Sequence, residues 1–142
     1  MKVTLDRIND AFHMEARNEE GNTVHIDNAE ERGGAGKGVR PMQLLLMGLG
    51  SCSAIDIINI LNKQKQKIDA FSIDVDGERD YDKVPALFEA IEVRFHFTGD
   101  LDPAKVRRAV DLSMEKYCSV TKTLEKTAEI TYKINLNNNP VH

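Results

Sequence analysis

The sequence predicts an α+β fold with a mainly antiparallel sheet and a long buried central helix. Three observations lead to this prediction. Short segments in which apolar and polar residues alternate occur near both ends of the chain and in its middle, which is typical of half-buried strands. A stretch of about 25 residues that begins at Pro41 is apolar on nearly every face, which is typical of a buried helix. The order strands, long helix, strands, helices, strand is that of an α+β protein.

The length and composition limit the classes of function. A chain of 142 residues and 15.9 kDa predicts one domain, residues 1–142. A net charge of −4 and the absence of Trp argue against a nucleic-acid partner. Charges interrupt every short apolar run at the N-terminus, so we expect a cytoplasmic protein without a membrane partner. The four scattered histidines and the lack of a CxxC pair predict no metal site, and no motif indicates a cofactor.

The N-terminal segment, up to Asp27, predicts a short antiparallel meander with a turn at residues 18–22. Its strands are expected at Val3–Leu5, Phe12–Met14 and Val24–Asp27. The glycine-rich residues 28–40 follow. Gly36-Lys37 resembles the end of a phosphate-binding loop, but Gly38 stands where Ser or Thr belongs and no buried apolar strand precedes it. This segment is therefore predicted to be a mobile connector.

The long helix is expected from Pro41, in the favoured first turn, to about Lys65. Small residues lie in its middle, where glycine costs about 1 kcal/mol relative to alanine, so another backbone is expected to pack closely there. A chain of this size is too small to cover such a helix on all sides. The sequence therefore predicts a homodimer with a shared core. The apolar residues are Leu44, Leu45, Leu46, Met47, Leu49, Ile55, Ile57, Ile58, Ile60 and Leu61, and the small ones Gly48, Gly50, Ser51 and Ser53.

The second half of the chain predicts two strands, a broken helix and a last strand. Residues 71–75 and 91–97 alternate with period 2. Asp102 and Pro103 are typical of the N-cap and the first position of a helix. This helix is expected to break at residues 117–119 and to be followed by a helical turn through residue 124. The last strand is expected at residues 130–134, and residues 137–142 are expected to form a frayed tail.

Cys52 lies in the middle of the predicted long helix. Steps of three and four residues place Asp56, Asn59 and Lys63 on the same stripe, which is a polar line on an otherwise apolar helix. The simplest interpretation is a small buried hydrophobe, as most free cysteines are. The Asp56 carboxylate one turn away also disfavours a thiolate.

Cys118 lies at the predicted helix break, between Lys116 and Lys122. A helix N-terminus and nearby ammonium groups favour a thiolate, so this cysteine is predicted to be the more acidic of the two. A packing role at a helix junction is equally open. The wide separation of the two cysteines along the chain leaves open whether the sulfurs meet.

Two segments carry a resemblance to a known family. Pro-Met-Gln-Leu-Leu-Leu at residues 41–46, running to Gly-Ser-Cys-Ser-Ala at 50–54, and Ser-Met-Glu-Lys-Tyr-Cys-Ser-Val at 113–120 resemble the OsmC/Ohr family of osmotically inducible and organic hydroperoxide resistance proteins. The likeness extends from the first strands to Ile134 and is closest to the OsmC-like branch. It implies an intertwined homodimer of α+β protomers with the long helices in the shared core.

The resemblance also implies thiol peroxidase chemistry. Cys52 would be the nucleophile that attacks an organic hydroperoxide, and Cys118 would be the resolving thiol. A thiolate displaces alkoxide from the O–O bond, and the resulting sulfenic acid condenses with the second thiol to a disulfide. An apolar wall of Leu45, Leu49 and Ile55 would favour a small apolar hydroperoxide. An unidentified thiol reductant would then regenerate the enzyme.

In the peroxidases of this family an arginine from the N-terminal strands activates the thiol, and a glutamate after the helix-starting proline holds it. Arg17 is the positional match for the arginine, with Arg40 and Arg79 as alternatives. Met42 occupies the glutamate position and Gln43 follows it. A second hypothesis is therefore an OsmC-like small-molecule binding protein with a non-catalytic cysteine pocket. A third is another thiol–disulfide activity of the same cysteines.

Overall fold

The computed structural model describes residues 1–142 and divides them into two compact units, Met1–Leu45 and Leu46–His142. It confirms the α+β class and the long helix, whereas the single domain stays a prediction. The first unit contains β1 (Val3–Arg7), β2 (Met14–Asn18), β3 (Thr23–Ile26), a short 3₁₀ helix (Glu30–Arg32) and the start of α1 (Pro41–Lys63). The second contains the rest of α1, β4 (Ala70–Arg79), β5 (Phe88–Thr98), α2 (Pro103–Leu112), a π turn (Ser113–Tyr117), α3 (Ser119–Leu124), β6 (Glu129–Leu136) and β7 (Asn139–Pro140).

The N-terminal strands form the expected meander, with β2 between β1 and β3 and both pairings antiparallel. The middle strand runs from Met14 to Asn18, so it begins where the predicted strand ends and continues into the predicted turn. Gly21 has a φ of 86°, a left-handed conformation that glycine adopts without steric cost. Its N–H donates to the carbonyl of Asn18 at 3.2 Å, which closes the turn between β2 and β3.

The glycine-rich segment after β3 is held by one carboxylate. Asp27 is 1% exposed, and its side chain accepts hydrogen bonds from the backbone N–H groups of Asn28 at 2.8 Å, Ala35 at 3.0 Å and Lys37 at 3.1 Å. Asp27 also pairs through its own backbone with Val39 at 3.0 Å. The prediction of a mobile connector is therefore wrong, because these bonds tie both ends of the loop to the end of β3.

The hydrogen bonds to Asp27 make the loop sensitive to acid. The N–H groups, that of Lys37 first, lower the pKa of this carboxyl below its ordinary value of about 3.9. A lowered folded-state pKa means that the stabilisation is complete above pH 4 and is lost as the pH falls through the folded-state value. In an NMR titration we expect the amide protons of Ala35 and Lys37 to shift with a midpoint below about 3.9. The Asp27→Asn variant should show no such titration, and a midpoint above 3.9 in the wild type would contradict the assignment.

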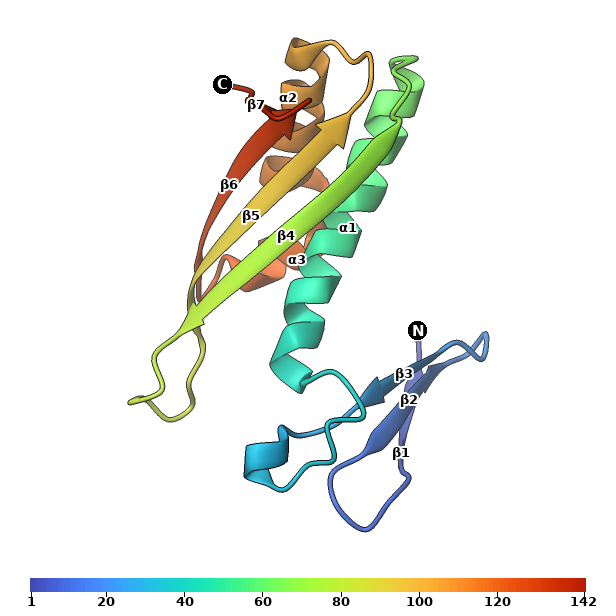
Figure 1. The fold of residues 1–142 in the computed structure, drawn as a ribbon, viewed down its shortest axis with the longest axis vertical. Helices are drawn as coiled ribbons and strands as arrows, with labels where there is room; N and C mark the ends of the chain where they lie inside the picture. The colour runs from blue at the N-terminus through green and yellow to red at the C-terminus, as the bar shows by residue number, and fades with distance from the viewer. The chain divides into compact units, whose positions relative to one another are not determined.

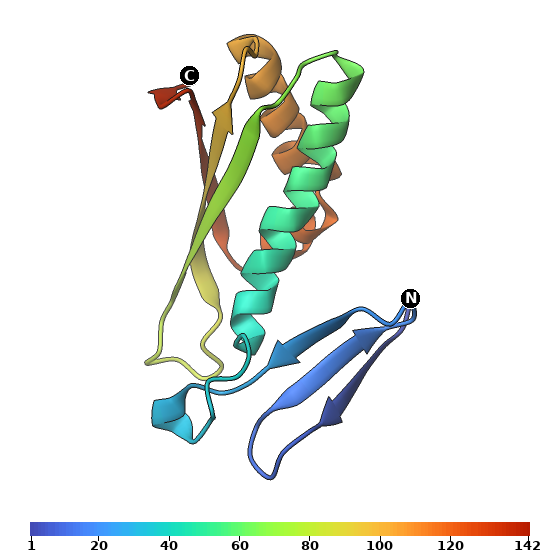
Figure 2. The same ribbon diagram turned by 45° about the vertical axis from the view of Figure 1, so that its right-hand side comes forward.

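The second unit contains a four-stranded sheet in the order β4-β5-β6-β7. Two of its pairings are antiparallel, as the sequence predicts, but β5 and β6 are parallel. A parallel pair needs a long crossover, and α2, the π turn and α3 supply it. Figures 1 and 2 show α1 and α2 on the same face of this sheet. The crossover is what brings Cys118 to the side of the sheet that α1 covers.

The core of this unit lies between the sheet and the helices on one of its faces. Alternate residues of β5 are buried, with Phe95 fully inaccessible, and Ile57 of α1 and Val106 of α2 are fully inaccessible as well. A Cβ placed on Gly50 would come within 3.2 Å of the Val75 methyl group, so glycine lets α1 approach β4 closely. The sequence predicts a close backbone neighbour for the small residues, but the atoms nearest to Gly50 belong to side chains of β4 in the same chain.

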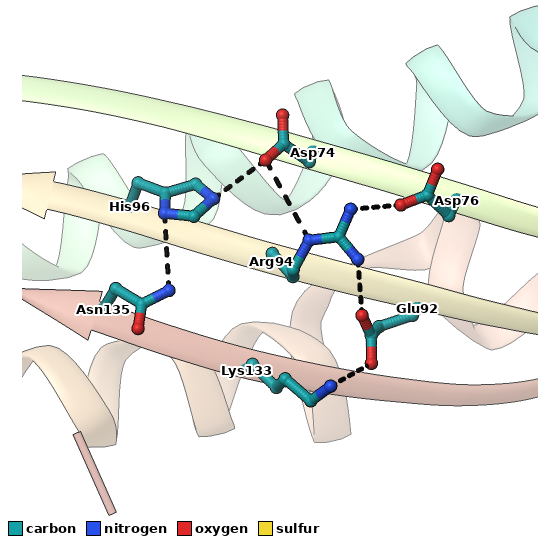
Figure 3. Close-up of polar contacts among 7 residues, drawn as sticks. All are labelled: Asp74, Asp76, Glu92, Arg94, His96, Lys133 and Asn135. Atoms are coloured by element: carbon teal, nitrogen blue, oxygen red, sulfur yellow. Dashed lines mark hydrogen bonds and ion pairs between the residues drawn. The ribbon is translucent and has the colours of Figure 1, made fainter. Parts of the chain in front are cut away.

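The opposite face of the sheet is covered by charged side chains (Figure 3). Arg94 pairs with Asp76 and, at 2.5 Å, with Glu92, whose other oxygen accepts from Lys133 at 2.6 Å. Exposed ion pairs of this kind contribute only about 0–1 kcal/mol each. They mark this face as the solvated side of the sheet. Asp74, His96 and Asn135 complete the network.

Helix α1 is covered on one side only within the chain, whereas the sequence predicts burial on every side. Met47, Ile55 and Ile58 lie on one helical stripe and are 51%, 62% and 38% exposed. By length and composition α1 is apolar enough to cross a membrane, with a mean hydropathy of 1.9 over its most apolar 18 residues. The core helices of water-soluble proteins share that property, so it is weak evidence for a membrane. The exposed stripe is an apolar surface that would be stabilised by burial against another apolar surface.

The C-terminal residues are ordered by a turn, so the expected frayed tail is wrong for residues 137–141. Asn137 and Asn138 adopt left-handed conformations, which asparagine tolerates better than most residues. The Asn137 side chain also bonds both backbone groups of Gly99, at 3.1 and 2.9 Å. The chain then turns back as β7 along β6, and the N–H of Val141 donates to Ile134 at 2.9 Å.

Candidate thiol site

Cys52 occupies the middle of α1 and is partly exposed. Its neighbour Ser53 is buried, and the Ser53 hydroxyl donates to the carbonyl of Leu49 at 2.7 Å, so the helix satisfies this polar group internally. The chain beside Cys52 is therefore regular helix, which fixes the direction in which the thiol leaves the backbone. A partly exposed thiol at such a position is accessible to a small molecule.

Cys118 is positioned by the broken helix that the sequence predicts. The Asp102 side chain caps α2, accepting from the N–H groups of Ala104 at 2.8 Å and Lys105 at 3.3 Å. After α2 the chain continues through the π turn, and the N–H of Cys118 donates to the carbonyl of Ser113 at 2.9 Å. Cys118 is the N-cap residue of α3, and its sulfur accepts from the N–H of Thr121 at 3.4 Å.

The two thiols are near each other in the structure. The side chain of Cys52 is one of the groups that raise the pKa of Cys118, although the two residues are far apart in the sequence. Both cysteines are free thiols. Cys118 is fully buried, whereas Cys52 is the one with an exposed edge. A small molecule that reaches the pair therefore meets Cys52 first.

The electrostatics of Cys118 contradict the sequence-based expectation that it is especially acidic. Burial raises the pKa of this thiol, and the neighbouring Cys52 raises it further, while the hydrogen bonds from Thr121 act in the opposite direction. The two lysines that suggested a stabilised thiolate are engaged elsewhere. Lys116 lies over the ring of Tyr117 at 5.4 Å, and Lys122 pairs with Glu125 at 2.9 Å. Cys118 is therefore predominantly a neutral thiol at pH 7.

A buried hydroxyl links the two cysteine-bearing segments. Ser113 is fully inaccessible, and its Oγ lies 3.3 Å from the carbonyl oxygen of Ser53 and 3.4 Å from Oδ2 of Asp56. The polar stripe noted in the sequence thus has a partner on the second segment. Sequence reasoning missed Ser113, because nothing in a sequence indicates that a serine faces a helix from a much earlier part of the chain.

Each of the three candidate arginines either bonds a local partner or lies outside the unit that contains the cysteines. Arg17 lies on β2, and its guanidinium bonds Oε1 of Glu15 at 2.5 Å, which raises the pKa of Arg17 and lowers that of Glu15. Arg79 donates to the carbonyl of Ala86 at 2.8 and 2.6 Å. Arg40 precedes α1. Of the three, only Arg79 belongs to the unit that contains the cysteines, and its donors are engaged with the backbone.

The residues around the helix start have structural roles. Oε1 of Gln43 accepts from the backbone N–H of Arg40 at 3.0 Å, as the third helical residue does in a capping box. Gln43 therefore stabilises the start of α1. The apolar wall expected beside the thiol needs a correction at Leu49, because this side chain is fully buried and does not face solvent. Ile55, by contrast, is 62% exposed.

Comparison with known proteins identifies relatives over most of the chain. The sequence profile of the OsmC-like protein family matches residues 34–133. Protein YhfA of Escherichia coli K12 is 46% identical over 97 residues, which cover 68% of this chain and 72% of that protein.

Solved structures show the same fold. A crystal structure of a hypothetical protein from Aquifex aeolicus is 29% identical, with a TM-score of 0.79 and 96% of each chain covered. The organic hydroperoxide resistance protein OsmC of Legionella pneumophila gives a TM-score of 0.69 at 17% identity, covering 94% of this chain and 96% of that one. At that identity, the second likeness establishes the fold and nothing more.

Proposed function

Since the chain belongs to the OsmC-like family, we propose that it is a cysteine-dependent peroxidase that reduces organic hydroperoxides. The observation that supports this proposal best is the proximity of two free thiols from distant segments, one partly exposed and one buried. In this proposal Cys52 is the nucleophile and Cys118 the resolving thiol. A disulfide between them would end each oxidation and would be reduced by an external thiol.

The exposure of the two sulfurs supports this division of labour. The thiolate of Cys52 attacks the outer oxygen of the hydroperoxide, forming an S–O bond while the O–O bond breaks and an alcohol leaves. The sulfenic acid of Cys52 then condenses with the thiol of Cys118: the S–S bond forms, the S–O bond breaks, and the hydroxyl group leaves as water with the proton of Cys118. Burial keeps Cys118 neutral and shielded from peroxide, which suits a thiol that acts only in the second step.

The proposal includes a cytoplasmic homodimer. The exposed stripe of α1, with Met47, Ile55 and Ile58, is an apolar surface in the middle of the chain's longest helix. A second copy of the chain would remove this surface from water, and the two helices would then share one core.

The proposed activating cation for Cys52 is Arg17, on the N-terminal strands. To act in this way, Arg17 would exchange its bond to Glu15 for one to the Cys52 thiolate.

Mass spectrometry of the oxidised protein tests the cysteine pair. Fully reduced protein treated with one equivalent of cumene hydroperoxide is expected to lose about 2 Da within seconds, through a disulfide between Cys52 and Cys118. Peptide mapping should recover that cross-linked pair. Thiols that stay reduced for many minutes would contradict the peroxidase proposal.

A binding protein is the second candidate, and one observation favours it. The guanidinium of Arg17 is bonded to Glu15, and Met42 stands where the peroxidases of this family hold their arginine with a glutamate. A thiol without an activating cation would serve as part of a pocket for a small apolar ligand. Native mass spectrometry of the purified protein should then show a retained ligand, and hydroperoxide should leave Cys52 unmodified.

A further inference from the structure

The carboxylate of Asp56 has an unusual setting on α1. It is partly buried on an otherwise apolar stretch of helix, and none of the ion pairs in the structure includes it. Its hydrogen-bond partner in the protein is the Ser113 hydroxyl, at 3.4 Å. A partly buried carboxylate without a cation is costly to keep, so its position calls for an explanation.

Asp56 lies one helical turn after Cys52. Side chains four residues apart on a helix are neighbours, with about 6 Å between their Cβ atoms. The carboxylate also lines a cavity of about 480 Å³, together with Tyr117, the residue before Cys118. Lys63 and Arg108 line the same cavity, and neither pairs with Asp56. The cavity thus runs from a carboxylate beside both cysteine segments to two free cations.

We propose that Asp56 is the proton carrier of the peroxidase reaction, a role that rests on the function proposed above. Reduction of a hydroperoxide by a thiol moves one proton from sulfur to the leaving oxygen. Asp56 takes the proton of the Cys52 thiol, and the resulting thiolate forms the S–O bond while the O–O bond breaks. The protonated Asp56 then gives this proton to the departing alkoxide, which leaves as the alcohol. The sulfur is oxidised by two electrons, the hydroperoxide is reduced by two, and Asp56 returns to its starting state.

The Ser113 hydroxyl positions the carrier. Because it is fully buried and also lies 3.3 Å from the Ser53 carbonyl, its location is fixed by both segments of the site. Its contact with one oxygen of Asp56 leaves the other oxygen for the sulfur and the leaving group.

Two rates measured on the Asp56→Asn variant test the proposal, because they are expected to change in opposite directions. Alkylation of Cys52 by iodoacetamide expels iodide, which needs no proton, and the thiol ionises in equilibrium with solvent before the slow reagent reacts, so this rate needs no proton carrier. Loss of the negative charge should therefore speed it about threefold at pH 7, as expected for a unit charge roughly 6 Å away in water. Oxidation by cumene hydroperoxide should slow about a hundredfold, the usual effect of losing a general acid. Asp56→Glu should recover part of the peroxide rate, and Asp69→Asn, an exposed control, should change neither rate.

The outcomes separate this inference from the function on which it rests. A wild-type protein that alkylates but ignores hydroperoxide would overturn both the peroxidase and the proton carrier. An active wild type with an equally active Asp56→Asn variant would overturn the carrier alone. If both rates of the variant fell together, and Asp56→Glu did not recover the peroxide rate, the role of Asp56 would be structural and the proposal would be wrong.

Discussion

The Cys52→Ser variant is expected to lose hydroperoxide reduction almost completely, with kcat/KM lowered at least about a thousandfold. A serine hydroxyl is too weak a nucleophile at neutral pH to attack the O–O bond, and removal of a nucleophile costs at least as much as the roughly 10²–10⁴-fold effect of removing an acid or base. Cys52 is the thiol with an exposed edge, so no other sulfur of the pair can meet the substrate first. Stopped-flow measurements of cumene hydroperoxide consumption would give the rate constants of the wild type and of the variant.

The Cys118→Ser variant is the matched control, because it removes the other sulfur of the pair. It should still complete the first oxidation and then stop at the sulfenic acid, which adds about 16 Da and is trapped by dimedone. Loss of the first oxidation in Cys118→Ser, with Cys52→Ser still active, would reverse the proposed roles. Equal slow consumption by the wild type and Cys52→Ser would exclude peroxidase chemistry at this site.

A charge placed on the exposed stripe of α1 is expected to break the proposed dimer. Ile55 is 62% exposed within the chain and lies between Met47 and Ile58 on the stripe. A two-fold interface contains each substitution twice, so Ile55→Glu would bury two unpaired carboxylates. We expect the dissociation constant to rise at least about a thousandfold. Sedimentation equilibrium should show about 32 kDa for the wild type, twice the chain mass of 15.9 kDa, and a monomer for the variant.

Val84→Glu is a suitable control for this experiment. Val84 is 98% exposed in the loop between β4 and β5, so the same change there adds a charge without touching the stripe. Its dimer should survive. A wild-type chain that sediments at the single-chain mass of 15.9 kDa at all concentrations would contradict the shared-core argument, whatever the behaviour of the variants.

Local signals predicted much of the fold. Alternation identified β4 and β5, and Asp102 with Pro103 located the start of α2, because both patterns depend on residues close together in the chain. The parallel pairing of β5 with β6 escaped prediction, because strand partners are chosen by packing over a long crossover. The turn at Asn137 and Asn138 was also missed, since its support comes from Gly99, 38 residues earlier.

The candidate site shows the same division between local and distant information. Both cysteines were visible in the sequence. The polar stripe that runs from Cys52 through Asp56 was also visible, because a helical period relates its residues. The acidity expected of Cys118 was wrong, because neighbouring lysines can be read from the sequence but complete burial cannot. The contact of Ser113 with α1 joins two segments that only the folded chain brings together.

The parallel pairing of β5 and β6 also bears on the order in which the strands are expected to pair during folding. β4 and β5 form an antiparallel hairpin from residues near in the chain, so they can associate early. β6 follows the whole crossover that contains Cys118, and such non-local pairing is the slower event because a long loop must close first. Because Cys118 lies in this crossover, its approach to Cys52 is expected to come late in folding. The proposed disulfide would then form only once β6 has joined the sheet.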